Sequence, residues 1–150
     1  MDDYDRRILT ALQRDASRPV EALAEDIGLS RNATWRRMRR LEETGVVTGR
    51  VALVDPDKVG LGLTVFIAVR TDRHDAAWAE EFGRAVAGFA QITGAYRTSG
   101  DLDYLITARV ADVQDYDRLY KALIARIELK DVSASFVMEK LKETTALPVR

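Results

Sequence analysis

The sequence contains no cysteine. Disulfide bonds, thiolate nucleophiles and thiolate metal ligands are therefore excluded, and this absence suits a cytoplasmic protein. No apolar run approaches the ~20 residues that a membrane-spanning helix needs, so no membrane partner is expected. Charges of opposite sign nearly balance, with a formal net charge of −1 over 150 residues. The chain as a whole therefore has no electrostatic attraction to nucleic acid, and any such contact needs a local basic patch.

Histidine is nearly absent as well. The single histidine, His74, lies in a polar loop with Asp72 and Asp75. A catalytic histidine needs a positioned partner and a tuned environment, and this loop offers little beyond the two aspartates. We therefore interpret His74 as a surface residue, and we expect no enzyme activity, no cofactor and no metal site.

Positive charge is concentrated in residues 31–50. Six arginines stand there against Glu42 and Glu43, which gives a local net charge of +4. Ser30 is a preferred helix N-cap and Gly45 a preferred helix stop, so the pattern predicts one basic helix between them.

This basic helix has two faces when its residues are placed about 100° apart. The inward face carries Thr34, Met38 and Leu41, and the outward, cationic face carries Asn32, Arg36, Arg39 and Arg40. Arginines that only confer solubility are the ordinary interpretation of such a charge run. The preceding residues favour another interpretation, because 21–27 form a short amphipathic helix and Gly28 permits a tight turn. Helix, three-residue turn and basic helix together predict a helix-turn-helix.

The remaining residues of the N-terminal half complete a small domain. A first helix is predicted over 4–15, and Pro19 suits the first position of the second helix. After the basic helix, residues 46–54 are β-branched and extended, which predicts a short strand or wing. The sequence therefore predicts a three-helix, winged helix-turn-helix domain over 1–54, followed by a linker over 55–62.

The second half alternates strand and helix patterns. Strands are predicted over 61–70, 92–99, 104–110 and 132–142, and helices over 75–88 and 113–127. This βαββαβ order predicts a ferredoxin-like domain over 63–150 with both helices on one face of the sheet, so the fold class is α+β. Phe66 and Ala68 would lie on the other face, and we expect a second subunit to cover them.

Several segments in this order resemble the Lrp/AsnC family, the leucine-responsive and asparagine-responsive regulators. The segments are Asp5-Arg-Arg-Ile-Leu9, Gly28-Leu-Ser30, Arg36-Arg-Met-Arg-Arg-Leu-Glu42, Gly45-Val-Val47, Ser99-Gly-Asp-Leu-Asp-Tyr-Leu105 and Thr144-Thr-Ala-Leu-Pro148. The resemblance implies a transcriptional regulator that binds double-stranded DNA and a small effector, often an amino acid. It also implies homodimers that assemble into tetramers or octamers. Trp35-Arg-Arg37 is similar to a bacterial subgroup, some of whose members respond to cysteine.

The candidate DNA contacts lie on and beside the basic helix. Arginine pairs bidentately with guanine and asparagine with adenine, which makes the outward face the candidate base-reading surface. Arg31 and Arg50 are better placed for phosphates, which position a protein without specifying sequence. Arg37 sits beside the inward face and is a candidate for bonding to the domain itself. The full set is Ser30, Arg31, Asn32, Arg36, Arg37, Arg39, Arg40 and Arg50.

The candidate effector site is the run 99–104. Glycine and aspartate form turns, so a hairpin turn is the ordinary interpretation; the resemblance places the effector here. Backbone N–H groups around Gly100 would bind the carboxylate of an amino acid. Asp101 or Asp103 would bind its ammonium group. With two serines that alternate on the last strand, the candidates are Ser99, Gly100, Asp101, Leu102, Asp103, Tyr104, Ser133 and Ser135.

Two other functions compete with a sequence-specific regulator. A chromatin-organising protein that binds DNA without sequence preference would share the basic helix, and the ratio of specific to random affinity separates the two. Tetrapyrrole decarboxylases resemble these regulators but depend on histidines, and one loop histidine argues against that activity.

Overall fold

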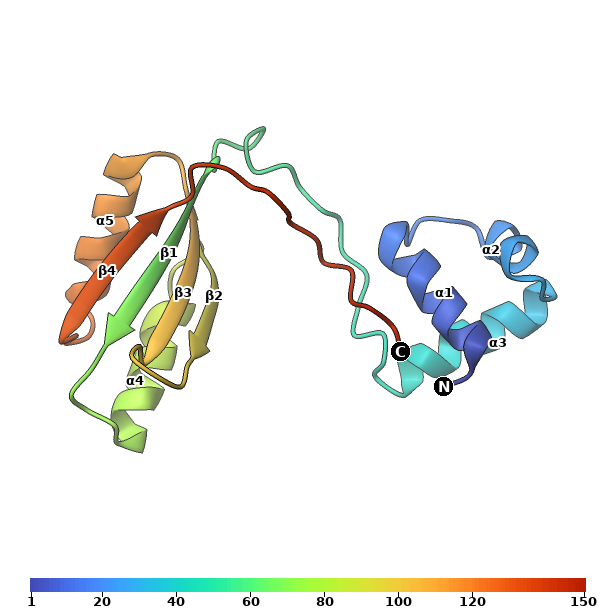
Figure 1. Ribbon diagram of the computed structural model, residues 1–150, viewed down its shortest axis with the longest axis horizontal. Coiled ribbons are helices and arrows are strands. Elements are labelled where there is room, and N and C mark those ends of the chain that lie inside the picture. The colour runs from blue at the N-terminus through green and yellow to red at the C-terminus, as the bar shows by residue number, and fades with distance from the viewer. The chain divides into compact units, whose positions relative to one another are not determined.

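Five helices and four strands follow one another along the chain in a computed structural model that describes residues 1–150 (Figure 1). They fall into two units, residues 1–53 with 141–150 and residues 54–140. The helices are α1 Asp3–Arg14, α2 Val20–Ile27, α3 Arg31–Glu43, α4 Ala76–Ala87 and α5 Val113–Ile124. The strands are β1 Leu63–Arg70, β2 Ile92–Arg97, β3 Tyr104–Val110 and β4 Asp131–Phe136. None of the helices has both the length and the apolar character needed to cross a membrane.

Local signals fix the ends of the first three helices. Asp2 and Asp5 form a capping box at the start of α1, in which each carboxylate accepts the other residue's amide. Ser30 Oγ accepts an amide hydrogen bond of 3.3 Å in the first turn of α3, which confirms it as the N-cap. Gly28 ends α2 with a left-handed φ of 75°. Pro19, expected inside α2, is instead its N-cap, because its extended backbone (ψ 145°) precedes the first helical turn.

The predicted inward face of α3 is buried against the other two helices. Met38 and Leu41 pack in one apolar cluster with Ile8 of α1. Thr34 is fully buried, and its hydroxyl donates to the Ser30 carbonyl at 3.1 Å, so no polar group is left unsatisfied there. The predicted helix-turn-helix is therefore confirmed.

The strand or wing predicted over 46–54 is absent. The Val47 amide donates to the Leu41 carbonyl at 2.9 Å and closes the end of α3, but no strand lies between α3 and β1. Val51 is 82% exposed. A β-branched composition favours extended backbone, but a strand also needs a hydrogen-bonded neighbour. No segment of the chain pairs with residues 48–54, so they remain extended and unpaired.

The last strand is shorter than predicted, and it ends at Phe136 instead of residue 142. Phe136 pairs with Val65, and the Val137 amide donates to the Thr64 carbonyl at 3.0 Å. β4 runs antiparallel to β1, and β1 begins at Leu63, one residue before Thr64. The chain beyond residue 137 therefore has no strand beside it to pair with.

The last ten residues, 141–150, pack with the N-terminal unit instead of with the sheet. Gln13 of α1 makes two hydrogen bonds to the backbone of Leu147. Its Nε2 donates to the Leu147 carbonyl at 3.1 Å, and its Oε1 accepts from the Leu147 amide at 2.6 Å. Val149 packs against the N-terminal apolar cluster. The tail is therefore a structural part of the helix-turn-helix unit.

The C-terminal unit confirms the βαββαβ prediction. Its antiparallel sheet has the strand order β2-β3-β1-β4, and α4 and α5 cover one face of it (Figure 1). Both helices begin at aspartate N-caps: Asp75 accepts from the Trp78 amide at 2.9 Å, and Asp112 accepts from the Asp115 amide at 2.7 Å.

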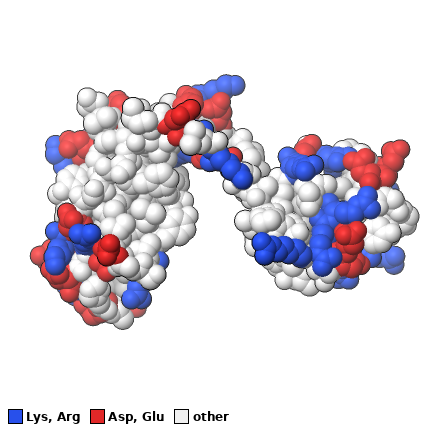
Figure 2. Space-filling view, in the orientation of Figure 1, with Lys and Arg blue, Asp and Glu red and all other residues white.

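The two faces of this sheet differ in the way the alternation of β1 predicts. Val65, Ile67 and Val69 are buried beneath the helices, in the same core as Trp78. Phe66, on the opposite face, is 41% exposed. Figure 2 shows a broad surface without charged side chains over this unit.

Removing the tail's contacts is expected to loosen the helix-turn-helix unit. Gln13→Ala deletes both hydrogen bonds to Leu147, and we expect it to lower the free energy of unfolding of this unit by about 1 kcal/mol. Amide hydrogen exchange in α1 and α3 should become faster while exchange in β3 stays unchanged. Arg150→Ala, at the exposed chain end, is the control. Equal exchange in α1 for Gln13→Ala and wild type would contradict a structural role for the tail.

Candidate nucleic-acid interface and effector site

The exposed face of α3 is a single stripe of side chains. Asn32, Trp35, Arg36 and Arg39 all lie open to solvent, and their spacing of three, four and seven residues places them on one side of a helix. Basic side chains gather over this unit in Figure 2. Asn32, Arg36 and Arg39 were predicted on this face from the helical spacing. Trp35 was not among the predicted DNA contacts, and its side chain is 47% exposed.

Most arginines around this stripe pair with surface glutamates. Arg39 Nε lies 2.7 Å from Glu43 Oε1, with both side chains 61% exposed. Arg31 pairs with Glu21 in the same way. Exposed pairs of this kind contribute about 0–1 kcal/mol each, so a phosphate or a base can replace the glutamate at little cost. Arg36 has no acidic partner and is the arginine of this face most available to a ligand.

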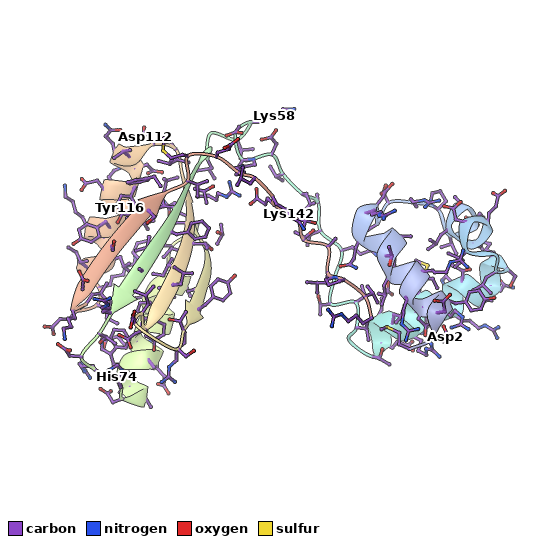
Figure 3. The ribbon with its side chains drawn as sticks, in the orientation of Figure 1. Asp2, Lys58, His74, Asp112, Tyr116 and Lys142 are labelled. Carbon is purple, nitrogen blue, oxygen red and sulfur yellow. The ribbon has the colours of Figure 1, made fainter.

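One buried carboxylate ties α1 to α3. Asp5 is completely buried, and its Oδ1 accepts a hydrogen bond from Arg37 Nη1 at 2.8 Å. Its Oδ2 accepts from Arg40 Nη2 at 2.6 Å and from the Asp2 amide at 3.0 Å. Asp2, labelled at the start of α1 in Figure 3, also accepts from Arg37 Nη1 at 2.7 Å. Two arginines of the basic helix, Arg37 and Arg40, are therefore held by carboxylates at the start of α1.

The hydrogen bonds keep Asp5 ionised despite its burial. Burial by itself raises the pKa of Asp5, but the Asp2 amide, the Arg37 guanidinium and the charge of Arg40 outweigh it, so the pKa lies below its ordinary value. The same bonds from Asp2 and Asp5 raise the pKa of Arg37. A buried carboxylate with three donors is compensated, whereas an unpaired one would be strongly destabilising.

This network changes the roles expected of two arginines. Arg37 bonds to the domain itself, which is one of the two alternatives that the sequence allowed. Arg40, expected among the base-reading residues, is anchored by Asp5, a partner that no local pattern indicated. Its side chain is still 56% exposed. Contact of Arg37 or Arg40 with DNA remains a prediction.

The run 99–104 forms the turn between β2 and β3. Gly100 has a φ of +109°, a conformation that side chains rarely adopt, and the space around it is open. The Thr71 amide donates to Asp103 Oδ2 at 2.9 Å, and the Asp103 amide donates to the Val69 carbonyl at 3.1 Å. Asp103 therefore holds the turn to the end of β1. Asp101 is exposed, so its carboxylate is better placed than that of Asp103 to bind an external cation.

The other predicted effector residues divide between the two faces of the sheet. Tyr104 packs with Phe82 and Trp78 on the helix side, with ring centroids 4.4 and 5.5 Å apart respectively, so it belongs to the core. Ser133 and Ser135 are exposed on the opposite face, beside Ala68 and Phe66. The structure thus separates Tyr104 from the serines.

Their positions along the strands also differ. Ser133 pairs with Ala68, next to the Val69 carbonyl that holds the turn, so Ser133 and residues 99–103 lie at the same end of the sheet. Ser135 lies two residues further from that end. His74, labelled in Figure 3, is 62% exposed, and its Nδ1 lies 3.7 Å from Asp103 Oδ1. The structure therefore places His74 beside this turn, at the surface.

Two family models match the chain. The AsnC-type helix-turn-helix domain matches residues 1–42, and the Lrp/AsnC ligand binding domain matches residues 64–147. The chain belongs to the Lrp/AsnC family. The first match covers the three helices that hold the basic stripe of this Lrp/AsnC regulator, and the second covers its sheet, its turn and most of its tail.

Known relatives of this Lrp/AsnC regulator match it along its length. It is 48% identical over 149 residues to the glutamate uptake regulatory protein of Zymomonas mobilis, an alignment that covers 99% of this chain and 91% of the relative. The crystal structure of an AsnC family transcriptional regulator from Agrobacterium tumefaciens is 47% identical, with a TM-score of 0.96 over 99% of this chain and 97% of the other. A transcriptional regulator from Neisseria meningitidis in complex with L-Met is 31% identical, with a TM-score of 0.94 over 99% and 96%.

The buried carboxylate gives a test by charge removal. Asp5→Asn keeps the shape of the side chain but loses the charge that binds two arginines, and we expect the free energy of unfolding at pH 7 to fall by about 2 kcal/mol. Because the pKa of Asp5 is lowered in the folded state, its stabilisation is complete above the ordinary value of 3.8 and is lost as the pH falls below it. The difference between wild type and variant should therefore shrink below about pH 4.

Thermal unfolding followed by circular dichroism at pH 7, 4.5 and 3.5 measures this difference. Asp3→Asn removes an exposed carboxylate from the same helical turn and is the control. A difference between wild type and Asp5→Asn that stays constant down to pH 3.5 would show that the charge of Asp5 does not contribute.

Proposed function

We propose that this Lrp/AsnC regulator places α3 in the major groove of operator DNA and reads bases with the exposed stripe of that helix. The observation that carries the proposal is the stripe itself, in which Asn32, Arg36 and Arg39 share one solvent-exposed side of a helix capped and packed as a recognition helix. A major groove about 12 Å wide admits such a helix. The protein acts in the cytoplasm as a regulator and not as an enzyme.

The arginines divide the work according to their partners. Arg36, without an acidic partner, and Asn32 hydrogen-bond to base edges. Arg31 and Arg50, at the two ends of the unit's basic surface, bind phosphates in place of their glutamates. Arg40 holds α3 in place through its bond to Asp5, and its exposed side contacts the phosphate backbone of DNA.

A homodimer forms through the uncovered face of the sheet. Phe66 and Tyr96 are 41% and 57% exposed, and the neighbouring positions on that face are small or uncharged. Exposed aromatic side chains on a sheet face are typical of an interface. A dimer presents two recognition helices, which favours operators with half-sites about one helical turn apart. We also propose that these dimers assemble further into tetramers or octamers, as the resemblance to the family implies.

An amino acid is the proposed effector, bound at the turn 99–103 with Ser133. The L-Met complex of the Neisseria meningitidis regulator supports this class of ligand. Exposed backbone around Gly100 suits the ligand's carboxylate, and the Asp101 carboxylate suits its ammonium group. Ser135 completes the polar lining on the same face. Binding shifts DNA affinity or assembly only if the ligand prefers one of the two states.

Replacing Arg36 tests the DNA interface. We expect Arg36→Ala to weaken binding to a duplex selected by the wild-type protein from a randomised library by roughly 10- to 100-fold, because one bidentate base contact is lost. Binding to random DNA should weaken far less, as measured by fluorescence anisotropy at fixed salt. Arg84→Ala removes the same charge from exposed α4 and is the control. Equal losses on selected and random DNA would assign Arg36 to phosphate contact and contradict base reading.

Thermal unfolding with each of the twenty amino acids at 10 mM tests the effector. A ligand at 100 times its Kd stabilises the native state by about 2.7 kcal/mol, which raises Tm by several degrees. Asp101→Asn should lose the shift while Asp117→Asn, an exposed change on α5, keeps it. Light scattering of the same samples reports assembly. An undiminished shift with Asp101→Asn would remove this turn from the effector site.

A further inference from the structure

The two tryptophans of the chain occupy opposite environments. Trp78 is 1% exposed in the core of the C-terminal unit, whereas Trp35 is 47% exposed on α3. Exposing half an indole forgoes part of the largest apolar burial that any side chain offers. Trp35 also takes no part in the apolar cluster of its own unit, which Met38 and Leu41 form from the inward face. Packing therefore gives no reason for an indole at this position.

The indole is braced on the surface of the helix. The guanidinium carbon of Arg39 lies 5.4 Å from the centre of the Trp35 ring, within cation–π distance. Arg39 is itself held by Glu43 at 2.7 Å, one turn further along α3. The indole therefore lies against the guanidinium of Arg39 at one edge of the stripe that also carries Asn32 and Arg36, and its apolar surface is open to solvent.

We propose that Trp35 is a specificity-determining residue that contacts the C5-methyl group of a thymine in the major groove. Thymine alone among the bases presents a methyl group there, and apolar side chains recognise it by contact. Asn32 and Arg36, on the same exposed side of α3, read the neighbouring base pairs. The inference rests on the proposed function, because it requires α3 to lie in the major groove.

Deoxyuridine provides the test, because it differs from thymidine only by lacking this methyl group. A duplex selected from a randomised library by the full-length protein is prepared with each thymine replaced in turn, and affinities are measured at fixed salt. We expect the wild type to lose about fourfold in affinity at one thymine of each half-site, which corresponds to burial of one methyl group. Trp35→Ala should bind the thymine and deoxyuridine duplexes equally.

Two further variants and a measurement of subunit number distinguish a thymine contact of Trp35 from a protein contact. Trp35→Phe keeps an apolar ring and should keep the sensitivity to the methyl group, and Arg36→Ala should keep it at reduced overall affinity. Wild-type tolerance of every deoxyuridine, or unchanged sensitivity in Trp35→Ala, would overturn the inference while leaving the proposed function intact. If Trp35→Ala changes the number of subunits and selects the same DNA sequence as the wild type, Trp35 makes a protein contact. That result would also overturn the inference. Failure of the wild type to select any sequence would overturn the proposed function itself.

Discussion

The DNA-binding unit depends on one buried carboxylate. Asp5 is enclosed without solvent contact and remains charged only because Arg37, Arg40 and the Asp2 amide all donate to it. The pairing fixes the start of α1 against the middle of α3 and thereby sets the rotation of α3 about its own axis. Because Thr34 and Met38 are buried, the stripe that begins at Asn32 faces solvent.

A second constraint is the period of two along β1. Val65, Ile67 and Val69 must be buried together, which leaves Phe66 on the other face of the sheet and directs α4 and α5 to one side. The uncovered face carries little charge and is suited to another subunit. In the proposed dimer, an effector at the end of this face, beside the turn that Asp103 holds, would lie next to the subunit interface.

The chain returns to its beginning through the tail. Gln13 and Leu147 are paired through two hydrogen bonds although they are 134 residues apart in sequence. The helix-turn-helix unit therefore incorporates residues from both ends of the chain, and the sheet unit is connected to it by two segments instead of one.

The sequence by itself determined the elements whose signals are local: the Ser30 cap, the inward face of α3 and the βαββαβ order, because each depends on residues within one or two turns or on strict alternation. Only the tertiary structure decided the partner of Arg40, the core position of Tyr104 and the lost strand over 46–54. Each of these depends on which distant segment comes near. The guanidinium of Arg40 is bound by a carboxylate on another helix, and a strand forms only beside a second strand. Such partners are distant in sequence, and the periodicity of the sequence does not identify them.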